Sequence, residues 1–347
     1  MSESQGGGGS YRPPMRLQQA LAGAARVVLT GHIDPDADVL GSVLGLANIL
    51  GREGWDTLPV CIGEMPSFLA SLPGHDRVVQ YPGRAMADSP PGLLLRPGDA
   101  LVVMDTPIET RMGAFYNQHK SVLPNCRTVV FDHHFTNSLY GDINFLNPIA
   151  AATAEVVCDV LDASDIAIDE ASATCFMAAL LADTQCFRTE NTSPRSLLRG
   201  YQLASAGAPI YPLAEVLFKT RPTAGLRLWG VALSSLQEQA GVIWTAVTNE
   251  MLRETQATME EVEGLVDFLL SSRDARVAIV LKEEIPGETK VSMRTVPGVD
   301  ATRIVGAFGG GGHQRAAGCT IDAAPDAAIA QLLVLVLDEL GEVVPAA

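Results

Sequence analysis

Short apolar runs alternate with amphipathic helical patterns between residues 26 and 147 of the chain. The runs are rich in Val, Leu and Ile and end at polar residues or glycine, as is typical of buried strands. A helical pattern over residues 38–52 follows the first run. The predicted strands cover residues 27–31, 57–62, 77–80, 101–104 and 128–131. Strands that alternate with helices predict a largely parallel sheet with helices on both faces.

The second half of the chain divides into a helical region and a further α/β region. Helical patterns cover residues 153–161, 170–181, 194–204 and 211–218, and the stretch 219–222 interrupts them. Beyond it we expect helices over 224–239, 259–270 and 327–340, and strands over 242–247, 277–281, 290–294 and 316–321. The predicted fold class is therefore α/β in two domains, as the length of 347 residues favours. The expected parts are a tail at 1–15, a parallel-sheet domain at 16–205, a linker at 206–222 and a smaller domain at 223–347.

Residues with oxygen or imidazole ligands follow several of the apolar runs. The carboxyl ends of parallel strands meet at one edge of a sheet, where open α/β sheets bind their ligands. These residues are His32, Asp34, Asp36, Asp38, Asp105, Asp132, His133, His134 and, after an apolar helix, Asp183. A single aspartate at a strand end is usually a turn or capping residue, but the conjunction predicts a metal site. Two further histidines, His75 and His119, have no such partners and are expected at the surface.

The mixture of donors indicates which metals to expect. Carboxylates and imidazoles without a thiolate suit Mn²⁺, or else Co²⁺ or Mg²⁺, better than a structural zinc ion. Two ions about 3.5–4 Å apart can share one carboxylate, lower the pKa of water and neutralise phosphate oxygens. The sequence therefore predicts two divalent ions, preferably Mn²⁺, and a hydrolytic reaction.

The glycine run at residues 309–312 is a second candidate site. Four glycines permit positive φ angles and close backbone approach, so successive N–H groups can form a nest that binds an anion. No Lys-Ser or Lys-Thr pair follows, so the run is not a Walker A loop. His313 and Arg315 add donors, and Arg294 lies at the end of the strand predicted at 290–294. The alternative that the residues leave open is a flexible turn with a buried histidine.

Composition limits the partners of this protein. The formal net charge of −16 disfavours long nucleic acids, which bind through many Lys and Arg contacts to phosphate, although it also serves solubility. A short anionic substrate is compatible with a local cationic pocket or metal site. None of the six cysteines forms a Cys-x-x-Cys pair, which favours reduced thiols and a cytoplasmic location. We find neither a signal peptide nor an apolar stretch near the ~18 residues of a membrane span.

The motifs together resemble those of the DHH phosphoesterases. The matching residues are His32, Asp36-Ala37-Asp38, Gly41-Ser42, Asp105, Asp132-His133-His134 and Asp183-Thr184. The segment Gly309 to Gly318, GGGGHQRAAG, resembles the glycine-rich signature of the C-terminal domain that accompanies many members. The resemblance covers almost the whole chain after about residue 16. It is strongest to the short NrnA-type subgroup of oligoribonucleases and pAp phosphatases, where pAp is 3′-phosphoadenosine 5′-phosphate.

The resemblance implies a role for each candidate in the first half of the chain. One metal is expected to bind His32, Asp36 and Asp105, and the other Asp38, Asp105, His133 and Asp183, so that Asp105 bridges the two. His134 is expected to face the substrate phosphate as a hydrogen-bond donor or general acid. Asp132 is expected to orient an imidazole. Asp34 is a departure from the family pattern, an extra charge in the metal loop to which no role is assigned.

The resemblance also implies a reaction and a substrate. We expect Mn²⁺-dependent hydrolysis of short oligoribonucleotides, pAp, or linear or cyclic dinucleotides such as cyclic di-AMP, by a two-metal mechanism in the cleft between the domains. The remote end of the nucleotide is expected to contact Gly310, Gly311, Gly312, His313, Arg294 and Arg315. Arg188, just after Asp183, is expected to contact phosphate, with a surface ion pair as its alternative. The expected partner is thus a short RNA or small nucleotide, with no long nucleic acid and no membrane, and a homodimer is one candidate assembly.

Two enzymatic alternatives and one non-enzymatic alternative stand beside this expectation. A pyrophosphatase or exopolyphosphatase would use the same metal domain, but pyrophosphatases of this superfamily carry a different C-terminal domain. A RecJ-like single-strand exonuclease is disfavoured by the chain length and the acidic charge. A non-catalytic nucleotide sensor would be expected to lack a metal ligand, and none is missing here.

Overall fold

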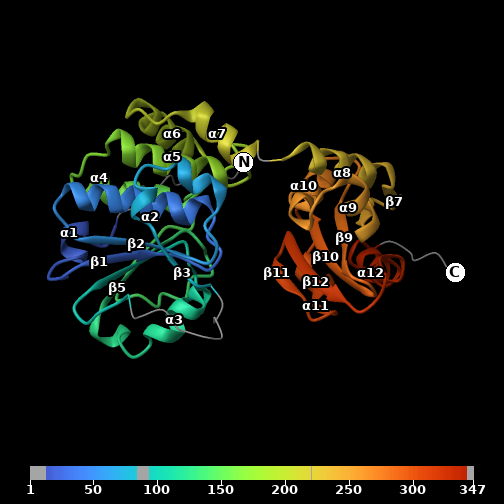
Figure 1. Ribbon diagram of the computed structural model, residues 1–347, viewed down its shortest axis with the longest axis horizontal. Coiled ribbons are helices and arrows are strands. Elements are labelled where there is room, and N and C mark those ends of the chain that lie inside the picture. Colours follow the sequence, from blue (N-terminus) through green and yellow to red (C-terminus); the bar gives the residue numbers. More distant parts are fainter. Residues whose placement is uncertain (1–12, 84–93, 220, 342–347) are drawn as a thin grey trace, which may run out of the picture. The chain divides into compact units, whose positions relative to one another are not determined.

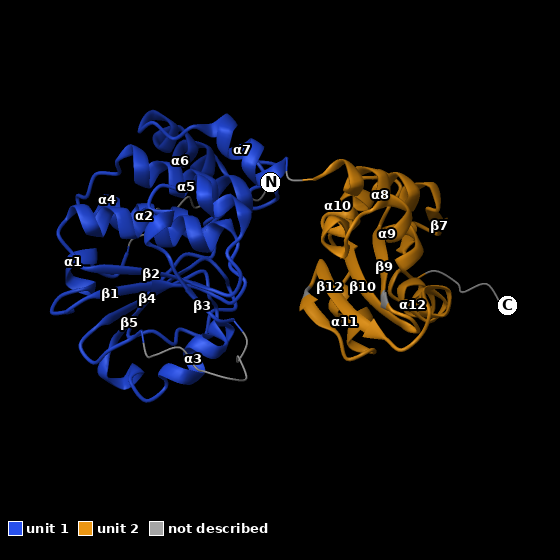
Figure 2. Cartoon of the chain, viewed as in Figure 1, with its two compact units in different colours: residues 1–220 blue, residues 221–347 orange. Residues whose placement is uncertain are grey.

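The computed structural model describes residues 13–83, 94–219 and 221–341. The chain forms two compact units, residues 1–220 (unit 1) and residues 221–347 (unit 2), coloured separately in Figure 2. Most of the predicted tail, residues 1–12, lies outside the described residues. The stretch 206–222, expected to be a linker, contains helix α7 (Ile210–Phe218), which packs on helix α5 (Glu170–Asp183) of unit 1. The ordered part of unit 1 therefore extends to the end of α7.

Unit 1 is built on a six-stranded sheet whose paired neighbours are all parallel, in the order β3-β2-β1-β4-β5-β6. The strands are β1 (Val27–Thr30), β2 (Thr57–Ile62), β3 (Val79–Tyr81), β4 (Ala100–Met104), β5 (Arg127–Asp132) and β6 (Ile143–Leu146). The strand order reverses between β1 and β4, and a reversal of this kind leaves a crevice at the carboxyl ends of the strands. The predicted ligands after β1, β4 and β5 all belong to this edge.

Helices cover both faces of this sheet (Figure 1). One face carries α2 (Ala37–Arg52), α4 (Thr153–Ala163) and α5, with α1 (Leu17–Ala20), α6 (Pro194–Ser205) and α7 on that side, and α3 (Ala114–His119) lies on the other. Short 3₁₀ helices occupy Ser67–Ser71, His75–Arg77, Glu109–Met112 and Leu123–Asn125. Helices α2 and α5 approach closely because α2 has glycine at the contact: a Cβ at Gly41 would lie 2.5 Å from the carbonyl oxygen of Cys175. This contact fixes the two helices that carry Asp38 and Asp183.

Unit 2 has a six-stranded mixed sheet in the order β11-β12-β10-β9-β8-β7, in which only β8 and β9 pair in parallel. The strands are β7 (Gln237–Gln239), β8 (Val242–Val247), β9 (Val277–Ile285), β10 (Glu288–Thr295), β11 (Gly311–His313) and β12 (Ala316–Ile321). One face packs on α8 (Thr223–Ser234), α9 (Asn249–Thr255) and α10 (Leu265–Leu270), with a 3₁₀ helix at Met259–Val262. The other face packs on α11 (Ala301–Gly306) and α12 (Pro325–Glu339).

The predictions for two helices of unit 2 were wrong, and the observed backbone conformation accounts for each difference. The helix predicted over 224–239 ends at Ser234, and residues 237–239 instead form β7, which pairs with β8 through a turn at Ala240 and Gly241 with positive φ angles of 48° and 79°. The helix predicted over 259–270 is broken at Gly264, whose φ of 79° is left-handed. Seven further short elements, β6, β7, β11, α1, α3, α9 and α11, were not predicted, since short elements carry weak periodicity.

The surface position expected for His119 is also wrong. Its side chain is fully buried, the N–H of Leu94 donates to its Nε2 at 3.0 Å, and its Nδ1 lies 2.7 Å from the carbonyl oxygen of Phe115. Burial lowers the pKa of this imidazole.

All six cysteines are free thiols, four of them buried. No helix among the described residues is long and apolar enough to cross a membrane.

Candidate functional site

The candidate metal ligands come from five places that the fold of unit 1 brings to one edge of its sheet. His32 follows β1, Asp36 and Asp38 lie at the start of α2, Asp105 follows β4, His133 and His134 follow β5, and Asp183 ends α5. Three groups of ligand atoms each lie within 4.8 Å of one another. The groups are His32, Asp36 and Asp105; Asp38, His133 and Asp183; and Asp105, His133 and His134. We call these seven residues the metal cluster.

Asp105 links the halves of the metal cluster. Its Oδ2 lies 3.8 Å from the Nε2 of His32, and its Oδ1 lies 3.3 Å from the Nε2 of His133. On the far side, the Nε2 of His133 is 3.3 Å from the Oδ2 of Asp183. Asp105 itself has a left-handed backbone with φ of 51°, which aspartate tolerates better than most residues. A carboxylate with one oxygen toward each group is suited to bridge two cations.

Hydrogen bonds orient two of the imidazoles. The Nδ1 of His32 lies 2.8 Å from the carbonyl oxygen of Ile33, and the Nδ1 of His133 lies 3.1 Å from the carbonyl oxygen of Ala150. A carbonyl oxygen accepts only, so Nδ1 carries the proton in each ring. In the neutral ring the Nε2 lone pair then faces the carboxylates, which is the arrangement of metal-binding histidines.

Asp38 is held by the start of helix α4. The N–H groups of Thr153 and Ala154 donate to its two carboxylate oxygens at 2.7 and 3.2 Å. The hydroxyl of Thr153 also donates to the Oδ1 of Asp105 at 3.0 Å, and the hydroxyl of Ser42 lies 3.3 Å from Asp38. Thr153 thus positions two candidate ligands at once. Thr153 is not among the residues predicted for the site, although a threonine at the start of a helix is a recognisable signal.

Asp36 has two tasks in the metal loop. Its Oδ1 caps helix α2 by accepting from the N–H groups of Asp38 and Val39 at 3.0 and 3.1 Å, and its Oδ2 lies 3.9 Å from the Nε2 of His32.

Asp34 takes no part in the cluster: it is exposed, with φ of 52°, and its N–H donates to the carbonyl oxygen of Ile62. The extra charge is therefore a left-handed turn residue.

Asp132 organises the segment after β5. This buried carboxylate accepts from the N–H groups of His133 and His134 at 2.7 and 3.0 Å, and from the Nδ2 of Asn137 at 2.6 Å. Its Oδ1 also lies 2.8 Å from the Nδ1 of His134, so Asp132 contacts that ring through Nδ1 and not through Nε2. Asp132 therefore orients His134 without being one of the clustered ligands.

The electrostatics of the metal cluster are compatible with bound cations. Burial and the nearby charge of Asp105 raise the pKa of Asp38. Burial and the nearby charge of Asp38 likewise raise the pKa of Asp183. Burial opposes ionisation of Asp105 too, but the hydrogen bond and charge of His133, with the charges of His134 and His32, hold its pKa low. The pKa of His133 is raised, since its contact with Asp105 and the nearby carboxylates outweigh burial. Converging carboxylates whose mutual repulsion perturbs their pKa values, together with oriented imidazoles, fit divalent ions.

Arg188 lies in unit 1 on the segment after Asp183. Three consecutive non-glycine residues, Gln185, Cys186 and Phe187, have φ angles of 45°, 59° and 63°, an unusual left-handed run. The Thr184 hydroxyl holds this turn by accepting the N–H of Phe187 at 3.0 Å. The side chain of Arg188 is exposed and makes no hydrogen bond or ion pair within the ranges that the structure describes.

The glycine run of unit 2 differs from the predicted nest. The N–H groups of Gly309 and Gly310 donate to the carbonyl oxygens of Gly306 and Val305 at the end of α11, so neither is available to an anion. Residues 311–313 form β11, paired with β12. A Cβ at Gly312 would lie 2.5 Å from the carbonyl oxygen of Ala316, so close packing of the strand requires glycine there. The alternative prediction of a flexible turn is also wrong for residues 311–313, because they form a strand.

The predicted arginines of unit 2 are on the neighbouring strands. Ala316 of β12 pairs with Arg294 of β10 on one side and with His313 of β11 on the other, so these three backbones share one cross-strand row. The Nε of Arg294 donates to the Oδ1 of Asp267 at 2.8 Å, and the Nε of exposed Arg315 donates to the carbonyl oxygen of Thr295 at 3.2 Å. The two guanidinium groups are thus partly engaged within unit 2.

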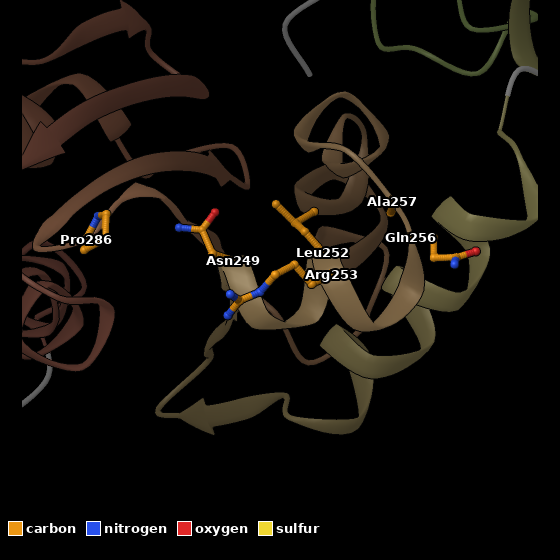
Figure 3. Close-up of a pocket in the computed structure, with 6 residues that line it drawn as sticks. All are labelled: Asn249, Leu252, Arg253, Gln256, Ala257 and Pro286. Carbon is orange, nitrogen blue, oxygen red and sulfur yellow. The ribbon is translucent and has the colours of Figure 1, made fainter.

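The pockets of unit 2 include two that are lined by described residues. One of about 700 Å³ is lined by Asn249, Leu252, Arg253, Gln256, Ala257 and Pro286, most of which lie on or just after α9 in Figure 3. The other, about 520 Å³, borders the glycine run and is lined by residues that include Lys282, Lys290 and Thr320. Lys282 and Lys290 are directly opposite each other on β9 and β10. Two of the four lysines of the chain therefore share one pocket.

Comparison with known families and proteins covers both units. The DHH family N-terminal domain matches residues 26–181, and the DHHA1 domain matches residues 240–342. The bifunctional oligoribonuclease and PAP phosphatase NrnA of Thermus thermophilus is 30% identical over 95% of this chain and 95% of its own. The cyclic-di-AMP phosphodiesterase GdpP of Geobacillus thermodenitrificans is 22% identical over 86% of this chain and 45% of its own.

Two solved structures share the fold. An exopolyphosphatase-related protein from Bacteroides fragilis superposes with a TM-score of 0.82 over 92% of this chain and 94% of its own, at 21% identity. The exonuclease RecJ bound to manganese superposes with a TM-score of 0.51 over 94% of this chain and 93% of its own, at 14% identity. At these identities the likeness establishes a shared architecture and leaves the reaction to be argued from the site.

Proposed function

The chain belongs to the DHH family of phosphoesterases, and from this premise we propose that it hydrolyses short nucleotides with two divalent metal ions, preferably Mn²⁺. The observation that carries the proposal is the position of Asp105, whose two oxygens face different groups of ligands in one buried cluster. The proposed substrates are short oligoribonucleotides, pAp, and linear or cyclic dinucleotides such as cyclic di-AMP. The named activities of the NrnA and GdpP relatives support this range.

In this proposal six of the seven residues of the metal cluster, all except His134, divide between two ions. His32, Asp36 and Asp105 would hold one, and Asp38, Asp105, His133 and Asp183 would hold the other. When bound, such ions activate water and neutralise charge on the phosphate. The oriented imidazoles, the helix cap at Asp36 and the Thr153 contacts support these roles, because they fix the donors before any ion binds.

His134 is the proposed proton donor. Burial lowers the pKa of this imidazole, but its hydrogen bond to Asp132 and the charge of Asp105 outweigh burial and raise it. A protonated ring with Nδ1 on Asp132 presents an Nε2–H donor to a phosphate oxygen or to the leaving oxygen. Asp132 acts through His134 as a positioning residue.

Unit 2 and Arg188 are proposed to bind the remainder of the nucleotide. The residues proposed for this are Gly310, Gly311, Gly312, His313, Arg294 and Arg315, where Gly310 would offer close backbone packing because its N–H already donates to Val305. The two lysines that line the pocket at the edge of the glycine run support an anionic ligand there, since they add positive charge to its lining. The free cysteines support the proposal that this enzyme works in the cytoplasm.

A substrate panel tests this function. The purified protein with Mn²⁺ is assayed against pAp, a ribodinucleotide, cyclic di-AMP, a long single-stranded RNA and inorganic pyrophosphate. We expect the highest kcat/KM on one of the three small nucleotides. Preference for pyrophosphate would identify the pyrophosphatase alternative, and preference for the long strand would identify the RecJ-like one. No turnover of any of the five with Mn²⁺ bound would contradict the proposal.

A further inference from the structure

A large aromatic side chain beside the metal cluster lies in water. Phe135 directly follows His134, and its side chain is 84% exposed, more than any other large hydrophobic residue described. Consecutive Cα atoms are ~3.8 Å apart, so the backbone of this residue lies directly beside that of His134. A single exposed apolar side chain is ordinary on a protein surface, so its significance depends on how it is held.

The backbone that carries Phe135 is fixed at both ends. The N–H of Asn137 donates to the carbonyl oxygen of His134 at 3.1 Å and closes a turn with Phe135 near its tip. The buried carboxylate of Asp132 accepts from the N–H of His134 at one end of the turn and from the side chain of Asn137 at the other. The ring is therefore displayed by a rigid turn rather than by a loose loop.

The chain beyond the turn is tied to the loop that follows Asp105. The N–H of Ser138 donates to the carbonyl oxygen of Pro107 at 2.9 Å, and the hydroxyl of Tyr140 donates to the carbonyl oxygen of Thr106 at 3.0 Å. Leu139 between them is held at φ of 57°, a conformation that costs energy for a leucine. Strain of this kind in a segment beside an active site is consistent with a functional requirement on its shape.

We propose that Phe135 stacks on a nucleobase of the bound nucleotide. This inference rests on the proposed function, and it names how the substrate is recognised beside His134. The base is the planar apolar part of a nucleotide, and aromatic rings bind bases by stacking with little dependence on sequence. Stacking also needs no positive charge, which suits a chain with a net charge of −16. Phe135 would thus contribute to affinity for the base while the metal cluster acts on the phosphate.

The first test compares substrates with and without a base. Wild type, F135A, F135W and Y201A are assayed with pAp and with ribose 3,5-bisphosphate, which keeps both phosphates and lacks adenine. Tyr201 is a matched control, because it is an aromatic residue 69% exposed on α6, which carries none of the clustered ligands. We expect F135A to lower the ratio of kcat/KM for pAp to that for the base-free substrate about 5- to 100-fold, mainly through KM. F135W and Y201A should retain the wild-type ratio.

The second test measures binding without turnover. The fluorescence of F135W, as a difference from wild type with its three tryptophans, is titrated with AMP and with ribose 5-phosphate in the presence of Ca²⁺. Saturable quenching by AMP and none by ribose 5-phosphate is expected. This result would support the inference even if the substrate panel showed no hydrolysis. An unchanged substrate ratio in F135A, or equal fluorescence responses to both ligands, would overturn it.

Discussion

In unit 1 the carboxylates of Asp38 and Asp105 are nearly inaccessible to water, with residue exposures of 0% and 4%, whereas in unit 2 Arg294 and Arg315 lie toward the surface. The carboxylates are held by a helix start and by a threonine hydroxyl, and their positions do not depend on a ligand. Arg294 is held by an ion pair with exposed Asp267, and such pairs contribute little stability. The contrast suggests that the chemistry depends on fixed geometry, whereas recognition by unit 2 relies on groups that rearrange at little cost.

The largest effect should come from removing the metals. Chelation with EDTA should abolish turnover of pAp, and added Mn²⁺ should restore it, because the cluster supplies converging carboxylates that need cations. Circular dichroism before and after chelation serves as the control for folding. Full activity in a sample that elemental analysis shows to be metal-free would contradict the two-metal proposal.

Replacing the bridging carboxylate should be the most damaging single change. D105N removes the charge that faces both ligand groups, so kcat should fall by orders of magnitude with a smaller change in KM. D34N is a matched control, since Asp34 lies on the same side of the sheet outside the cluster and should leave kcat within about twofold. A D105N enzyme that binds two metals tightly and turns over near the wild-type rate would disprove the bridge.

Changes in unit 2 should affect substrates according to length. H313A and R315A should lower kcat/KM for a ribodinucleotide about 5- to 100-fold, since a charge-assisted contact contributes ~1–3 kcal/mol. Activity on a long RNA should change less, so the preference for short substrates should weaken. Mn²⁺ binding, measured by calorimetry, should stay as in wild type. Variants with unchanged length preference would separate unit 2 from substrate recognition.

A smaller effect is expected at Thr153. T153V removes the hydroxyl that donates to Asp105 but keeps the N–H that donates to Asp38. Loss of one such supporting contact should weaken Mn²⁺ binding roughly 10-fold, and T153S should restore it. Equal Mn²⁺ affinities in T153V and wild type would show that the hydroxyl does not support the site.

The smallest effect is a dependence of metal affinity on pH. The pKa values of Asp38, Asp183 and His133 are raised, so protons on these groups persist to higher pH than on isolated side chains. Metal ligands must lose their protons to bind, and Mn²⁺ affinity should therefore increase from pH 6 to pH 8. The rise in melting temperature on adding Mn²⁺ measures this, and a larger rise at pH 6 than at pH 8 would contradict it.

More of unit 1 than of unit 2 could be predicted from the sequence, for physical reasons. The strand ends of unit 1 could be located because buried parallel strands are short apolar runs and their ligands follow immediately, as His32 follows β1 and Asp105 follows β4. The contact between Thr153 and Asp38 joins residues 115 positions apart, and no local pattern encodes it. The glycine run predicts a nest because glycine permits that conformation, but the backbone conformation of residues 311–313 is determined by pairing with β12. Local patterns located the residues that cluster at the sheet edge, while tertiary contacts determine how these residues are supported.

Metal stoichiometry tests the central claim most directly. Metal-free enzyme is titrated with Mn²⁺ while bound metal per chain and turnover of pAp are measured on the same samples, for wild type and D105N. The account predicts two bound ions per wild-type chain, activity that rises with the second, and fewer than two ions in D105N. Full activity of the wild type with one bound ion or none would contradict it.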